Sequence, residues 1–121
     1  MRWLEEAERK LRAAELLLRE GLYDSACLLS YLAAHISLYQ LIEQSEELFS
    51  QAPLVFMLKR LPDVSSEILH SAKILETYSL PLRIPASIPE GVPSDYIDKS
   101  MAEEALTHAK AIMEFVKGEM G

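Results

Sequence analysis

Several features on which small proteins often depend are missing from this 121-residue chain. It has one cysteine, Cys27, so no internal disulfide can form. Its four glycines stand apart from one another, so no glycine-rich loop is available to hold a phosphate group. No lysine or arginine occurs between Arg19 and Lys59, and the net charge is -7. Direct DNA or RNA binding is therefore not expected, because an acidic chain repels phosphate backbones.

Length and polarity favour a single domain over residues 1–121, large enough to bury its own core without a metal or disulfide. The first twenty residues are dense in charge, which is unlike an apolar signal segment, so we expect a cytoplasmic protein. Asparagine is absent and glutamine occurs only three times, a bias typical of proteins from thermophiles.

Helical periodicity dominates the chain, and no segment shows the alternation typical of a β-strand. The pattern predicts an all-α protein: an up-and-down bundle of four long helices with one additional short helix and a long proline-rich crossover. We expect Ser100 with Glu103 to form a capping box for the last helix, with Ser94 as the other possible start, and Gly118 to end it. The expected helices are 2–20, 25–42, a short one opened by Pro53, 65–78, and the last one.

The segment 25–42 carries no formal charge, and its length approaches that of a membrane span. Polar residues interrupt it and no basic residue flanks it, so we expect a buried helix and no membrane. The helical wheel divides it into a small-residue face and a bulky face. Because both are apolar, we expect neighbours in the same chain and a second copy to cover it, as a homodimer. The small residues are Ala26, Cys27, Ser30, Ala33, Ala34 and Ser37; the bulky ones are Leu28, Tyr31, Leu32, His35, Ile36, Leu38, Tyr39 and Ile42.

A proline at every fourth position marks the segment 79–94, SLPLRIPASIPEGVPS. Proline disfavours helix at itself and at the preceding residue, so we expect 79–93 to run extended along the bundle, held by its aliphatic residues. Arg83 is the only cation between Lys73 and Lys99, and a held arginine is suited to bidentate contact with phosphate or carboxylate. Its alternative role is an ion pair with Glu90 or Asp95.

Three parts of the sequence resemble the HEPN domain family, and together they cover nearly the whole chain. The opening WLEEAERKLRAAELLLREGLYDSA resembles the first two helices of the family. Arg83-Ile84-Pro85 stands where many members have Arg-Tyr-Pro, and Tyr96 followed by AEEALTHAKAIMEFV resembles the last helix. The resemblance implies a homodimer, often encoded beside a small nucleotidyltransferase, sometimes as a toxin–antitoxin pair. It also implies that some members bind nucleotides.

Other residues depart from the family pattern. Where many members have Gln-Ala-Ala-Glu, this chain has Leu32-Ala33-Ala34-His35. HEPN ribonucleases carry an arginine followed at short spacing by a histidine (Arg-x4–6-His), and no arginine here has that partner. We therefore expect no catalytic residues, and a ribonuclease is the least favoured reading.

Four side chains are candidates for binding a ligand: Arg83, Tyr39, Tyr96 and His35. Tyr31 and Tyr39 flank His35 at one helical turn, although a histidine satisfied inside the core is the commoner arrangement. His108 and Glu104 are expected to form a surface pair, and no metal site or cofactor is predicted. The leading hypothesis is a non-catalytic homodimeric module that acts with a separate partner protein. The alternative is a protein that binds a nucleotide or small anion through Arg83.

Overall fold

The computed structural model describes residues 2–42, 53–83 and 90–120, with the backbone alone for 79–83. These ranges are helical and contain no strand, which confirms the all-α bundle of four long helices with one short one. The elements are α1 (Arg2–Arg19), α2 (Tyr23–Ile42), α3 (Leu54–Lys59), α4 (Ser66–Arg83), the 3-10 turn η2 (Pro93–Asp95) and α5 (Lys99–Met120).

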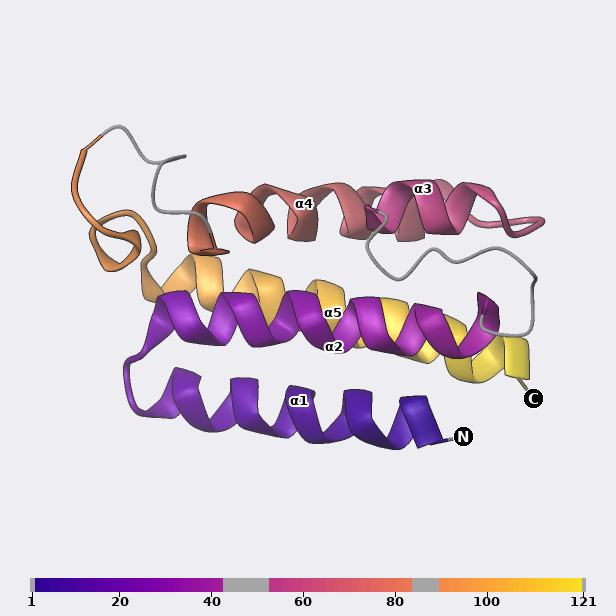
Figure 1. The fold of residues 1–121 in the computed structure, drawn as a ribbon, viewed down its shortest axis with the longest axis horizontal. Helices are drawn as coiled ribbons and strands as arrows, with labels where there is room; N and C mark the ends of the chain where they lie inside the picture. Colours follow the sequence, from indigo (N-terminus) through magenta and orange to yellow (C-terminus); the bar gives the residue numbers. More distant parts are fainter. Residues whose placement is uncertain (1, 43–52, 84–89, 121) are drawn as a thin grey trace.

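The long helices lie side by side, each antiparallel to the helix before it, with α2 in front of α5 (Figure 1). Helix α1 packs along one side of α2, while α3 and α4 lie on the opposite side. Gly21 makes the tight turn between α1 and α2 with φ 79°, a left-handed conformation in which residues with a side chain are strained. Glu76 of α4 accepts a hydrogen bond from the first amide of α3, Leu54 N, and joins these two helices.

Helix α2 is the centre of the core, and its two faces differ in burial. The entire small-residue face is buried, while most of the bulky face is only half-buried. Small side chains let α1 and α5 approach α2 closely, because little volume separates the backbones. By length and hydropathy α2 is the one described helix that could cross a membrane, but 56% of its apolar window is buried inside the protein. It has the position of a core helix.

Local hydrogen bonds set the helix starts, and one predicted cap is wrong. Ser65 Oγ accepts from Ile68 N at 3.2 Å and caps the start of α4. At α5 the cap is Asp98, whose carboxylate accepts from Met101 N at 2.9 Å and also from the hydroxyl of Ser100. These bonds lower the pKa of Asp98. Gly118 does not end α5, which continues to Met120.

The proline-rich crossover begins later than predicted, because α4 continues through Pro81 to Arg83. The extended conformation expected from residue 79 is therefore wrong for 79–83. Pro81 removes one backbone hydrogen bond, and only two residues of α4 follow it. The cost to the helix is therefore small. After the gap, Val92 is 56% exposed, so it does not hold the crossover to the bundle as expected. The predicted roles of Ile84 and Ile88 lie outside the described residues.

Candidate functional site

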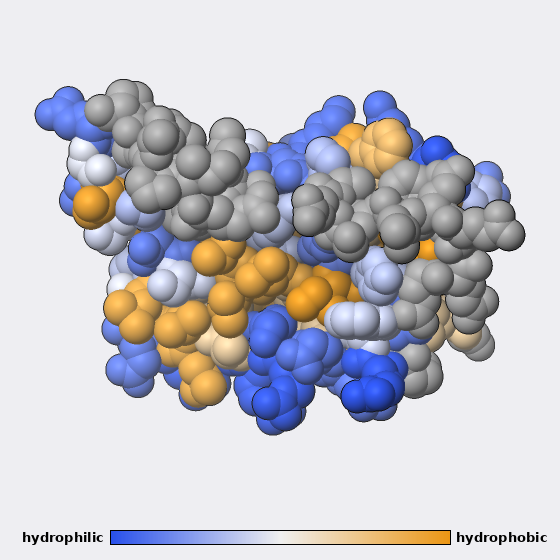
Figure 2. Space-filling view, viewed as in Figure 1, coloured by the Kyte–Doolittle hydropathy of each residue, from blue (hydrophilic) through white to orange (hydrophobic). Residues whose placement is uncertain are grey.

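The open side of α2 carries apolar side chains that the described helices leave half-buried. Figure 2 shows hydrophobic surface running from the α1–α2 turn towards the middle of α2. Exposed Leu22, in the turn, is 51% accessible and continues this surface. The remaining side chains are half-buried and recur at helical spacing: Leu28, Leu29, Leu32, His35, Ile36 and Tyr39. We call this set the α2 open face.

A groove of about 580 Å³ borders the α2 open face at the end away from the turn. Arg2, Trp3, Glu6 and Lys10 of α1 line one wall, and Ile36 contributes the apolar wall from α2. Within this wall Glu6 forms an ion pair with Lys10, whose Nζ lies 3.1 Å from Glu6 Oε1. The groove therefore joins an apolar floor to a wall that carries more positive than negative charge.

The first turn of α1 is held against the last turn of α2 beside this groove. Gln40 Oε1 accepts hydrogen bonds from Trp3 N at 3.1 Å and from Leu4 N at 3.3 Å. The indole of Trp3 meets the ring of Tyr39 edge to face, with 5.1 Å between centroids. Sequence reasoning missed Gln40, although an amide inside an uncharged helix is a signal of a buried polar contact. This contact fixes how α1 and α2 are aligned.

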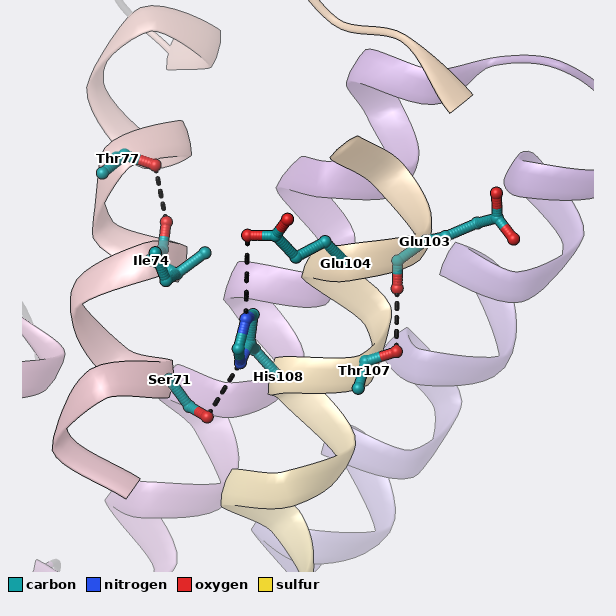
Figure 3. Close-up of polar contacts among 7 residues, drawn as sticks. All are labelled: Ser71, Ile74, Thr77, Glu103, Glu104, Thr107 and His108. Carbon is teal, nitrogen blue, oxygen red and sulfur yellow. Dashed lines mark hydrogen bonds and ion pairs between the residues drawn. The ribbon is translucent and has the colours of Figure 1, made fainter. Parts of the chain in front are cut away.

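A polar cluster lies between α4 and α5 (Figure 3). His108 Nδ1 lies 2.9 Å from Ser71 Oγ, and His108 Nε2 lies 3.7 Å from Glu104 Oε1. The ring of His70 stands edge-on to that of His108, with 5.7 Å between centroids. The predicted surface pair is wrong in one respect, because the His108 side chain is only 18% exposed. Helix α4 covers the side of α5 on which His108 lies.

Serine, histidine and glutamate in this order resemble the groups of an acyl-transfer triad, but the surroundings do not suit that chemistry. Ser71 is 5% exposed and lies in the middle of α4, where the backbone amides are engaged in the helix. A substrate carbonyl would find neither access to the hydroxyl nor free amide donors for an oxyanion. The cluster is better explained as a polar contact that aligns α4 with α5.

The thiol of Cys27 and the phenol of Tyr78 are buried near one another at the turn end of the bundle. Burial is the main cause that raises the pKa of Cys27 to about 12, with the negative charge of Asp24 as the next cause. Burial likewise raises the pKa of Tyr78 to about 12, followed by the effect of Cys27. A thiol with so high a pKa is a poor nucleophile at neutral pH, as expected for the buried small-residue face.

The four predicted ligand residues do not converge in one chain. Tyr78 lies near Cys27, at the start of α2, and Arg83 follows Tyr78 in α4, so both belong to the turn end of the bundle. The segment from η2 to the start of α5, which contains Tyr96, lies at the same end (Figure 1). Tyr96 is 52% exposed and its hydroxyl donates to Glu90 O. Tyr39 lies near the opposite end of α2. A cleft that joins Arg83 with Tyr39 is therefore not present within one chain.

His35 lies between these ends, on the α2 open face. Its ring is 5.8 Å from that of buried Tyr31, while Tyr39 turns to Trp3 instead. Of the two tyrosines that flank His35 at one helical turn, Tyr31 contacts its ring and Tyr39 packs against Trp3. Among the described residues no group of three or more His, Cys, Asp or Glu side chains is placed to hold a metal ion.

Comparison with known proteins identifies the family. The family model of the HEPN domain matches residues 1–119, and the chain belongs to this family. The crystal structure of TT1696 from Thermus thermophilus is similar, with a TM-score of 0.88 and 33% identity over 96% of this chain and 94% of that one. A comparison with curated proteins found no match.

Two further solved structures share the fold. ST0689, described as an archaeal HEPN homologue, has a TM-score of 0.82 and 28% identity, covering 98% of this chain and 95% of its own. A HEPN domain protein from Thermotoga maritima has a TM-score of 0.77 and 20% identity, covering 99% of this chain and 98% of its own. The resemblance read from the sequence is confirmed at the level of family and fold.

Proposed function

We propose that this HEPN protein is a non-catalytic homodimeric interaction module in the cytoplasm, formed by one domain and acting with a separately encoded partner protein. The observation that carries this proposal is the α2 open face. It presents leucine, isoleucine and aromatic side chains in a row on the central helix, where the chain's own helices leave them half-buried. Contiguous apolar surface of this kind is typical of protein–protein interfaces.

The polar groups of the protein support a non-catalytic role. The buried thiol has a raised pKa, and the His108 cluster gives no access to a substrate. Ion pairs on the described helices, such as Lys117 with Glu8 at 3.4 Å, join exposed side chains on the surface. The family resemblance implies a minimal nucleotidyltransferase as the partner class, in a toxin–antitoxin-like pair.

Sedimentation equilibrium tests the homodimer directly. We expect the wild-type protein to sediment as a dimer and Leu32→Glu to sediment as a folded monomer, because a buried charge in the interface has no partner. Leu16→Glu is the matched control: Leu16 is 51% exposed on the outer side of α1, so this variant should remain dimeric. A wild-type protein that is strictly monomeric at high micromolar concentration contradicts the proposal.

The partner is tested by co-expression with a nucleotidyltransferase encoded next to the gene. Support is a complex of fixed stoichiometry in size-exclusion chromatography, unaffected by the Leu16→Glu control. If the two proteins elute separately at micromolar concentration, the homodimer would act without this class of partner.

A second candidate function is the binding of a nucleotide or small anion near Arg83. It is favoured by one observation: the end of α4 and Tyr96 belong to the same end of the bundle. Thermal shift with common nucleotides and with inorganic phosphate tests it, since a ligand at 100 times its Kd stabilises the fold by about 2.7 kcal/mol. Unchanged melting in every case, or an equal shift for Arg83→Ala, would remove this candidate.

A further inference from the structure

We infer that two copies of the chain dock with their α1–α2 hairpins antiparallel, so that Arg2 of each copy meets Asp24 of the other. The inference rests on the proposed homodimer and assigns its geometry. It depends on three features of the hairpin: the alignment of α1 with α2, the distribution of charge along it, and the positions of its exposed apolar side chains.

The alignment follows from contacts at the open end of the hairpin. Gln40 bonds the amides of Trp3 and Leu4, and Trp3 packs on Tyr39. Counting the same number of residues inward along both helices brings Leu11 level with Leu32. The middle of the hairpin therefore lies at these two leucines, and a two-fold axis through this level would exchange its two ends.

Charge differs between these two ends. Arg2 lines the groove at the open end, while Lys10 lines it near the middle of the hairpin and is paired with Glu6. Asp24 lies in the first turn of α2 at the closed end, and it is half-buried. Neither Arg2 nor Asp24 forms an ion pair with a described residue. An unpaired cation at one end and an unpaired acid at the other are suited to an interface that exchanges the ends.

The two limiting symmetric arrangements, parallel and antiparallel, differ in which charges they bring together. If the two-fold axis runs along α2, the two copies of α2 are parallel and their open ends meet. The two Arg2 side chains then lie at the same end of the dimer. If the axis crosses α2, the helices are antiparallel, and Arg2 faces the partner's Asp24. Opposite helix macrodipoles also favour the antiparallel arrangement. The contact between Arg2 and Asp24 therefore favours the antiparallel arrangement.

Exposed apolar side chains at the two ends support the same geometry. Trp3 is 42% exposed at the open end, and Leu22 is 51% exposed at the closed end. In the antiparallel arrangement they lie at corresponding levels and cover each other, and Leu28 comes opposite Ile36. Helix α2 has 20 residues and is about 30 Å long; with α1 beside it the face is about 20 Å wide, or about 600 Å². This approaches the area that each partner contributes to a stable interface.

Charge reversal tests the arrangement by sedimentation equilibrium. Arg2→Glu and Asp24→Arg should each raise the dimer Kd about tenfold, because symmetry makes each change repulsive at two places. The double variant, Arg2→Glu with Asp24→Arg, should recover to within about threefold of the wild-type value, because the pairs are restored with reversed sign. Arg9→Glu is the matched control: its side chain is 79% exposed and lies by Glu6, so its Kd should change less than threefold.

Cross-linking gives a second measurement that does not depend on charge. In a Cys27→Ser background, Leu28→Cys chains mixed with Ile36→Cys chains should form mainly mixed disulfide dimers. A dimeric wild type with no recovery in the double variant, or with mainly Leu28→Cys to Leu28→Cys dimers, overturns the geometry but leaves the homodimer standing. A monomeric wild type overturns the proposed homodimer as well.

Discussion

The two faces of α2 differ in how deeply the rest of the chain buries them. The small-residue face, from Ala26 to Ser37, is buried against α1 and α5, while the α2 open face keeps its larger side chains half-buried. Hydrophobicity alone would place the bulky residues inside. The arrangement shows that close helix packing selects small side chains, and that the larger ones remain available for contacts between chains.

The largest expected effect comes from removing volume where α2 is fully buried. Leu38 is 0% exposed, so Leu38→Ala should lower the free energy of unfolding by about 3 kcal/mol. The same substitution on the open face, Leu32→Ala, should cost the single chain about 1 kcal/mol, because little cavity forms. Urea unfolding at low protein concentration measures both. Equal losses would mean that the open face is packed as tightly as the fully buried positions of α2.

Adding volume tests the same difference in the other direction. Ala34 is 0% exposed, and Ala34→Leu should destabilise the fold by about 2 kcal/mol, because no space is available for the added carbons. Ser25→Leu, on the half-exposed side of α2, is the control and should change the stability by less than about 0.5 kcal/mol. If Ala34→Leu unfolds at the same urea concentration as the wild type, the small-residue face is not tightly packed.

Gln40 lies at the edge between the two faces, and its removal should have an intermediate effect. Gln40→Ala leaves the amides of Trp3 and Leu4 without their acceptor, at a cost of about 1 kcal/mol. Hydrogen exchange should show the change in these two amides first. If protection of both amides is retained in Gln40→Ala, the side chain does not hold the first turn of α1.

The rate of thiol labelling compares the accessibility of the two faces and does not require a change in stability. Cys27 should resist iodoacetamide at pH 8, since the thiol is buried and its pKa is raised to about 12, so the thiolate is scarce. The added thiol in Ser25→Cys should react quickly at low concentration and more slowly where the dimer forms. Mass spectrometry separates the two sites. Reaction of both thiols at one rate would contradict the difference between the faces.

Sequence reasoning predicted the helices well because apolar residues recur at helical spacing along α1 and α5, and because α2 is a long segment without formal charge. It also separated the small from the bulky residues of α2 correctly. It did not say which face would be buried, because the wheel gives directions around one helix and not the positions of its neighbours. The exposure of His108 was predicted wrongly for the same reason. Helix α4 covers a second side of α5, and the apolar pattern of α5 alone does not reveal this neighbour.

Helix ends were harder to predict than helix centres. Ser100 and Asp98 are both good capping residues, and only the geometry selects the carboxylate. We expected α4 to end before Pro81, but the helix continues to Arg83. Near a helix end proline costs only one backbone hydrogen bond, so its tendency to break the helix is weak there. The candidate site was the least predictable part. Arg83 was chosen for its side-chain chemistry, whereas its distance from Tyr39 depends on the packing of helices far apart in the sequence.

The bond between Gln40 and the opening turn also has a consequence for the order of events during synthesis. The amides of Trp3 and Leu4 leave the ribosome long before the side chain that receives them. These two amides therefore stay hydrated until nearly the whole of α2 has emerged from the ribosome. A translational pause before Gln40 would prolong this hydrated state, and one after it would let the hairpin close before the remaining helices arrive.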